Sequence, residues 1–212
     1  YSWPGGQTYV GQLKDGQPNG QGTATSPDGD KYVGQWNNGQ RHGKGKAIIY
    51  RGGDKDNVDT YAGDYKNDAP DGRGTYTWHN GDTYTGGYRA GLRHGKGTAN
   101  YYRRGQKYVG QFIDDQPNGK CTATYLLGVK YAGDFNDGEP HGRGTYTWPN
   151  GEKYVGKFYR GQPHGQGIYT WPNGDKYVGW FENGLLHGKG TLSYANGKRQ
   201  TGKWDFGQYI GR

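Results

Sequence analysis

The chain of 212 residues has a single cysteine, no methionine and only 29% hydrophobic residues. One cysteine excludes an internal disulfide framework and favours a reducing compartment. No apolar run approaches the roughly 20 residues needed to cross a bilayer, and no signal-peptide core opens the chain. We therefore expect a cytoplasmic protein, either free or peripheral to a membrane or the cytoskeleton.

The low hydrophobic content comes with 44 glycines and 9 prolines, and such a composition alone is typical of disordered chains. Two observations favour a folded protein instead. Aromatic residues make up 16% of the sequence. Glycine and proline also recur at fixed intervals, and residues that return at fixed places specify turns.

The sequence is a tandem repeat with a period of mostly 23 residues. Each unit begins with a tyrosine that is followed two residues later by glycine. A period of this length predicts a linear array of small structural units. Two units are longer, one by an insertion at about residues 53–60 and one by a single residue near Arg103 and Arg104. The initial tyrosines are Tyr9, Tyr32, Tyr61, Tyr84, Tyr108, Tyr131, Tyr154 and Tyr177.

Each unit reads as a β-hairpin. In the unit that starts at Tyr154, residues 154–158 and 167–171 alternate between large and small side chains, which is typical of strands. The Gly-Gln-Pro-His-Gly stretch between them predicts a loop, and residues 172–175 predict a turn to the next unit. Glycine is too frequent for a typical helix. The expected fold is all-β: an elongated, single-layer antiparallel sheet of tandem hairpins.

Strand alternation sorts the side chains onto two faces. With the initial tyrosine as position 0, one face collects positions 0, 2, 4, 13, 15 and 17, where rings alternate with glycines; we call it the aromatic face. Position 4 is apolar or aromatic in every unit, from Leu13 to Trp204. The opposite face collects positions 1, 3, 12, 14 and 16, which are mainly polar.

The unit Tyr177-x-Gly179-x-Phe181-x-x-Gly184-x-x-His187-Gly188-x-Gly190 resembles the MORN repeat (membrane occupation and recognition nexus). The resemblance implies hairpins stacked into a twisted rod or groove that serves as a scaffold, an adaptor or a module joined to an enzyme. Residues 9–199 would form eight repeats, residues 1–8 the tail of a truncated preceding repeat, and residues 200–212 a degenerate or truncated ninth. Asp68 and Asp115 depart from the pattern by replacing glycine at position 7.

Histidines at position 10 do not predict a metal site, because Asn19, Asp71 and Asn118 occupy the same slot. All three residue types tolerate the left-handed conformation, so we expect a turn residue here. Metal binding stays open only where two arrays meet. The glycine slot at position 13 holds Cys121, which we expect to be a small residue in a tight place. With three serines and no catalytic constellation, the segment predicts no enzyme, cofactor or metal.

Net charge is +8, and part of it is ordered at position 12. This basic column predicts either a solvated face or contact with anionic lipid or an acidic partner. Nucleic acid is not expected, because the aromatic residues are predicted on the opposite face. The residues of the basic column are Lys44, Arg73, Lys96, Lys120, Arg143 and Lys189.

Contiguous exposed aromatic surface usually marks a binding site. We therefore expect a scaffold that binds an extended peptide or a helix of a partner protein along the aromatic face. Alternatives are binding to an anionic membrane, regulation of an adjoining enzyme domain, and self-association through the ends of the array. The expected partner-binding residues are Tyr131, Phe135, Tyr146, Trp148, Tyr154, Phe158, Tyr169, Trp171, Tyr177 and Phe181.

Overall fold

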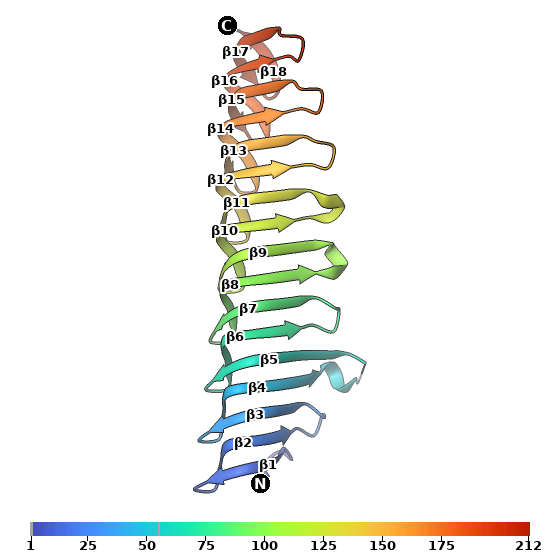
Figure 1. Cartoon of the computed structure of the whole chain (residues 1–212), viewed down its shortest axis with the longest axis vertical. Helices are drawn as coiled ribbons and strands as arrows, with labels where there is room; N and C mark the ends of the chain where they lie inside the picture. Colours follow the sequence, from blue (N-terminus) through green and yellow to red (C-terminus); the bar gives the residue numbers. More distant parts are fainter. Residues whose placement is uncertain (1, 55) are drawn as a thin grey trace. The chain divides into compact units, whose positions relative to one another are not determined.

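A computed structural model of the protein describes residues 2–54 and 56–212 (Figure 1). Tyr1 of the predicted tail and Lys55 of the predicted insertion lie outside the described residues. The fold is an open antiparallel arrangement of tandem β-hairpins, which confirms the all-β prediction. Its only helical elements in the described ranges are three 3-10 helices of three residues each, η1 (Arg51–Gly53), η2 (Tyr102–Arg104) and η3 (Leu126–Gly128).

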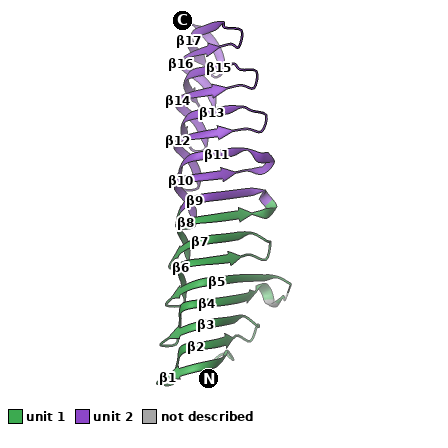
Figure 2. Ribbon diagram, viewed as in Figure 1, with its two compact units in different colours: residues 1–103, 112–115 green, residues 104–111, 116–212 purple. Residues whose placement is uncertain are grey.

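The chain divides into two compact units, a division that the repeat pattern did not predict (Figure 2). Unit 1 comprises residues 1–103 and 112–115. Its strands are β1 (Thr8–Lys14), β2 (Gln17–Thr25), β3 (Lys31–Asn37), β4 (Gln40–Tyr50), β5 (Val58–Lys66), β6 (Ala69–Thr77), β7 (Thr83–Arg89) and β8 (Leu92–Tyr101). Within it, each strand from β1 to β8 pairs with the next one along the chain.

Unit 2 comprises residues 104–111 and 116–212, and it repeats the same topology. Each strand from β10 to β18 again pairs with the next one. The strands are β9 (Gln106–Ile113, of which 106–111 belong here), β10 (Gln116–Thr124), β11 (Lys130–Asn136), β12 (Glu139–Thr147), β13 (Lys153–Tyr159), β14 (Gln162–Thr170), β15 (Lys176–Glu182), β16 (Leu185–Ser193), β17 (Arg199–Asp205) and β18 (Gln208–Gly211).

The hairpin turns are shorter than the repeat pattern predicted. In the β15–β16 hairpin, only Asn183 and Gly184 separate the strands, with φ of 49° and 82°. Two consecutive residues with positive φ form the turn that matches the natural twist of a hairpin. From its second residue on, the Gly-Gln-Pro-His-Gly stretch therefore belongs to the following strand, because β14 already begins at Gln162.

The prediction that the histidines adopt a left-handed turn conformation is wrong. His141 lies inside β12, and the left-handed residue is the next one, Gly142, with φ of 64°. The strand register shifts between Gly133 and Phe135, opposite this site, so the segment is a β-bulge. A bulge of this kind needs one residue with positive φ, and glycine adopts it without strain.

The core lies within the aromatic face itself. The Tyr154 ring covers the backbone of Gly156 and Gly167, where an added Cβ would lie 2.4 Å from the Tyr154 hydroxyl oxygen in each case. That hydroxyl donates a hydrogen bond to the Lys157 carbonyl at 2.9 Å. Most other initial tyrosines make the same hydrogen bond. Large rings that cover the glycine backbone thus form the core, in place of a second layer of secondary structure. Leu13 is an exception to the buried position 4, since it is 51% exposed.

Candidate functional site

Six of the ten predicted partner-binding residues are core residues. Their rings form a continuous edge-to-face ladder, in which Tyr154 lies 5.1 Å from Phe158 and 4.9 Å from Phe181 between ring centroids. Edge-to-face contacts at this distance are favourable aromatic geometry. A partner cannot reach these rings directly, so they support the face. The six, all between 0 and 3% exposed, are Tyr131, Phe135, Tyr154, Phe158, Tyr177 and Phe181.

The other four predicted residues are half-buried and form a second row of rings in unit 2. Tyr146 lies 4.9 Å from Trp148, Trp148 lies 5.7 Å from Tyr169, and Tyr169 lies 4.7 Å from Trp171. Tyr125, which the sequence reasoning missed, extends the row by stacking on Tyr146 at 6.0 Å with an interplanar angle of 7°. We call these five residues the aromatic row.

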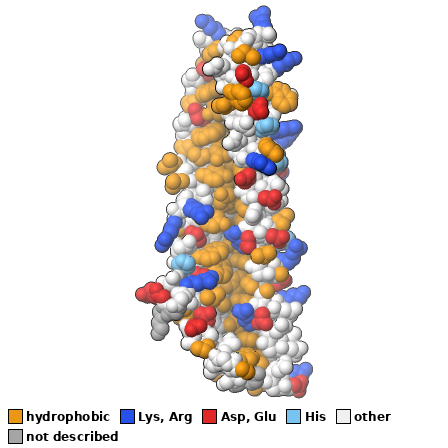
Figure 3. Space-filling model, turned by 180° about the vertical axis from the view of Figure 1, so that it is seen from behind, with side chains coloured by type: hydrophobic (Ala, Val, Ile, Leu, Met, Phe, Trp, Pro, Cys, Tyr) orange, Lys and Arg blue, Asp and Glu red, His pale blue; other side chains and the backbone are white. Residues whose placement is uncertain are grey.

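Local structure explains why the aromatic row is ordered. Tyr146 and Tyr169 lie near the ends of β12 and β14, and each tryptophan opens the turn that follows its strand. The Trp171 amide donates to the Asp175 carbonyl at 2.9 Å, which fixes the turn. Burial raises the pKa of Tyr169 to about 12, so its hydroxyl is neutral at physiological pH. Figure 3 shows hydrophobic side chains gathered in a band that crosses the strands, with most charged side chains to either side of it.

In unit 1, two arginines lie over rings at positions 0 and 4, which correspond to the buried ladder of unit 2. The Arg41 guanidinium lies 5.8 Å from the Tyr32 ring centroid and 5.4 Å from that of Tyr65. Its Nε donates to Asp68 at 3.2 Å. Such a cation over a ring is attractive, and it helps to bury these core rings.

A second arginine in unit 1 repeats this arrangement. Arg93 lies over Tyr84 and Phe112, and its Nε donates to Asp115 at 3.0 Å. Sequence reasoning recorded Asp68 and Asp115 only as departures from glycine. Each of these aspartates follows a repeat that has arginine at position 9, where proline is usual. Sequence reasoning did not connect the two substitutions.

The six residues of the basic column are all exposed, as predicted, and three belong to each unit. Two of them are neutralised by a facing carboxylate: Lys44 contacts Asp64 at 2.5 Å, and Lys120 contacts Asp134 at 2.6 Å. The hydrogen bond from Lys120, despite partial burial, lowers the pKa of Asp134.

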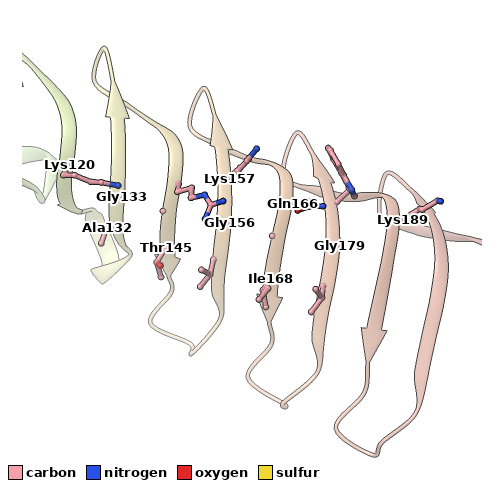
Figure 4. A pocket seen from close by; sticks show the side chains of 16 residues that line it. Lys120, Ala132, Gly133, Thr145, Gly156, Lys157, Gln166, Ile168, Gly179 and Lys189 are labelled. Carbon is pink, nitrogen blue, oxygen red and sulfur yellow. The ribbon is translucent and has the colours of Figure 1, made fainter.

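Nucleic acid was not expected because the aromatic residues were predicted on the face opposite the basic column. The position of Trp180 contradicts that reason. It stands at position 3, on the face of the basic column, and is 50% exposed. A cavity of about 800 Å³ opens on the same face of unit 2 and is lined by Lys120, Arg143, Lys157, Trp180 and Lys189 among others (Figure 4). The face predicted to be merely polar thus carries an aromatic residue and a groove.

Residues 2–54 and 56–212 offer few candidates for a metal site, a reactive thiol or a membrane span. They contain no grouping of three or more His, Cys, Asp or Glu side chains suited to a metal ion. Cys121 is unpaired and buried, and burial raises the pKa of its thiol. In the same residues, no helix has the length and apolar character of a membrane span.

Comparison with known proteins identifies the repeat. The family model of the MORN repeat matches residues 9–31, 32–53, 61–83, 84–102, 108–125, 131–153, 154–176 and 177–199. No curated protein matches the sequence.

Solved structures show only distant likeness. The TCP domain of Drosophila melanogaster SAS-4 (dCPAP), in complex with a proline-rich motif of Ana2, is 11% identical with a TM-score of 0.43, over 92% of this chain and 99% of that one. The TCP10 domain of Danio rerio CPAP, in complex with a STIL peptide, is 13% identical with a TM-score of 0.27, over 93% and 100%. Virginiamycin B lyase from Staphylococcus aureus is 7% identical with a TM-score of 0.18, over 93% and 73%.

Proposed function

The chain belongs to the MORN-repeat family, and we propose that it is a non-enzymatic cytoplasmic scaffold that binds a peptide or a helix of a partner protein along the aromatic row. The observation that carries this proposal is the half-buried, continuous series of five large rings in unit 2. Rings held at centroid distances of 4.7 to 6.0 Å present a rigid apolar surface with little conformational entropy to lose on binding.

The support beneath the aromatic row favours the same function. Tyr146 packs on Phe158 at 6.1 Å, and Phe158 belongs to the buried ladder. A partner would therefore meet side chains whose rotamers are already fixed, and tryptophan and tyrosine are the residues most enriched at binding hot spots. Contact with a membrane, regulation of an adjoining enzyme domain and self-association through the array ends stay predictions.

A peptide-display selection on the immobilised chain tests the proposal. We expect selected peptides to lose at least about thirtyfold in affinity for Trp148→Ala/Trp171→Ala, because the loss of even one hot-spot tryptophan costs about 2 kcal/mol. Trp180→Ala is the matched control, since it removes an exposed tryptophan from the other face. Tyr154→Ala is unsuitable, because that ring is part of the core. If no peptide is selected, or if those selected bind the double variant as tightly as the original chain, the proposal is wrong.

A further inference from the structure

The groove on the basic face of unit 2 crosses several strands, with lining residues from Lys120 in β10 to Lys189 in β16. Its floor is the backbone of paired glycines, Gly144 with Gly156 and Gly167 with Gly179, whose Cα atoms carry no side chain toward the aromatic face and whose neighbours in the strand form the walls. One wall is apolar and includes Val155, Ile168 and Val178, whereas the other carries lysines and arginine (Figure 4). The groove therefore combines an apolar side and a cationic side along one line.

The cationic wall contains like charges placed opposite each other. Arg143 pairs with Lys157 across β12 and β13, and both line the groove, whereas Lys189 at the groove's end pairs across β16 and β17 with Lys203, which lines the adjoining smaller cavity. In the described part of the chain, none of these four side chains makes an ion pair. Like charges directly opposite each other destabilise a sheet. The equivalent pairs of Lys44 with Asp64 in unit 1 and of Lys120 with Asp134 at the other end of the groove are instead ion pairs, at 2.5 Å and 2.6 Å.

Position 3 has also lost a structural role in this part of unit 2. In four other hairpins its side chain accepts a hydrogen bond from the bulge amide at position 12, as Gln35 does from Lys44 at 2.9 Å and Asp134 from Arg143 at 3.1 Å. Lys157, Trp180 and Lys203 occupy position 3 in the last three hairpins. None of these side chains can accept a hydrogen bond from an amide. Both the charge and the missing acceptor act against stability, which favours a role in binding.

We propose that this groove binds an extended acidic segment of a partner protein, laid across the strands of unit 2. Its carboxylates would lie over the two cation pairs, and its apolar side chains would contact Val155, Ile168 and Trp180. The two cation pairs are four strands apart, or about 19 Å, which an extended chain covers in about six residues. A segment with two acidic pairs about six residues apart and apolar residues between them fits both walls.

The geometry favours a peptide over a membrane or a nucleic acid. A flat bilayer surface would meet the protruding cations and leave the recessed glycine floor unfilled. Single-stranded nucleic acid is held by a series of stacking aromatic residues, whereas this groove offers Trp180.

The test measures the affinity of a labelled twelve-residue peptide, with two glutamate pairs six residues apart and leucines and isoleucines between them, by fluorescence anisotropy. The control peptide has the same composition in scrambled order. Lys157→Gln removes one cation and restores the acceptor for the bulge amide. We therefore expect it to weaken peptide binding about fivefold, as for the loss of one exposed ion pair. We expect the same variant to unfold at an equal or higher temperature. If Lys157 had a purely structural role, its loss would lower the unfolding temperature together with the peptide affinity.

Matched variants separate this site from the aromatic row. Lys96→Glu, in the basic column of unit 1, and Trp171→Ala should leave the affinity for the acidic peptide unchanged, whereas Trp180→Ala should weaken it. Equal binding of the scrambled peptide, or unchanged binding by Lys157→Gln, would overturn the proposal. So would the failure of the acidic peptide to bind while phosphatidylserine vesicles or an oligothymidylate bind in a Lys157-dependent manner, because either would identify a different ligand.

Discussion

At the scale of single residues, the sheet is stabilised by tyrosine rings, each of which packs over the backbone of two glycines. One hairpin departs from this arrangement. In the hairpin of β9 and β10, Cys121 replaces the second glycine, and its Sγ occupies the space beside Gly110, where an added Cβ would lie 2.5 Å away. The thiol donates to the Gln111 carbonyl at 3.1 Å, the bond that a tyrosine hydroxyl makes elsewhere. Tyr108 is half-buried here and lies 6.1 Å from Tyr125, at the end of the aromatic row.

The bulge provides a prediction at this scale. Gly142→Val forces a β-branched residue into the left-handed region at a φ of 64°, and we expect a loss of about 1–2 kcal/mol in the free energy of unfolding. His141→Asn is the matched neighbour: it lies in regular strand conformation, and asparagine occupies this slot in other repeats, so we expect little change. Urea unfolding followed by tryptophan fluorescence measures both, and equal stability of the two variants would contradict the assignment of the bulge.

At the scale of elements, the insertion after β4 does more than lengthen a turn. It extends the hairpin, because Ile49 and Tyr50 pair with Asp59 and Val58. Asp59 is consequently buried at 0% exposure. Its carboxylate accepts hydrogen bonds from the Arg51 Nε at 2.8 Å, the Tyr76 hydroxyl at 2.9 Å and the His79 amide at 2.8 Å. Although burial raises the pKa of Asp59, these bonds lower it to about 2.

Because the pKa of Asp59 is lower in the folded chain than its usual 3.8, the carboxylate stabilises the fold above about pH 4. That contribution, about 2 kcal/mol, is lost as the pH falls towards 2. We expect Asp59→Asn to destabilise the chain at pH 7 and the difference from the original chain to shrink below pH 4. Urea unfolding at several pH values measures this, with Asp28→Asn in an exposed turn as control. A difference that stays constant down to pH 2 would show that the charge of Asp59 is not what stabilises this hairpin.

At the scale of the whole molecule, the two units differ in the side chains on their surfaces. At position 15, where unit 2 carries Tyr146 and Tyr169, three of the four repeats that start in unit 1 carry alanine, which interrupts the row of rings there. Unit 2 leaves the aromatic row half-buried, and it also holds the like-charged pairs Arg143–Lys157 and Lys189–Lys203. Both proposed binding sites therefore lie in unit 2, on opposite faces of its sheet, and one chain could hold two partners at once.

The tandem repeat predicts an elongated particle, because each hairpin contacts only its neighbours along the chain. Sixteen or more strands at about 4.8 Å each predict a length of about 75–80 Å. Small-angle scattering in solution measures it. A radius of gyration near 17 Å, the value expected for a compact domain of this length, would contradict the prediction.

Sequence alone determined the hairpin repeat, the two faces of the strands and the position of the basic column, because strand alternation and glycine spacing are local properties of the chain. Only the tertiary structure decided which rings are accessible. Tyr154 and Trp171 have the same aromatic character, yet one lies over two glycines and the other beyond the end of its strand. It also placed Arg41 on Asp68, 27 residues away, and opened a groove beside Trp180. Contacts between repeats depend on how neighbouring strands pair and bend, which a pattern within one repeat does not contain.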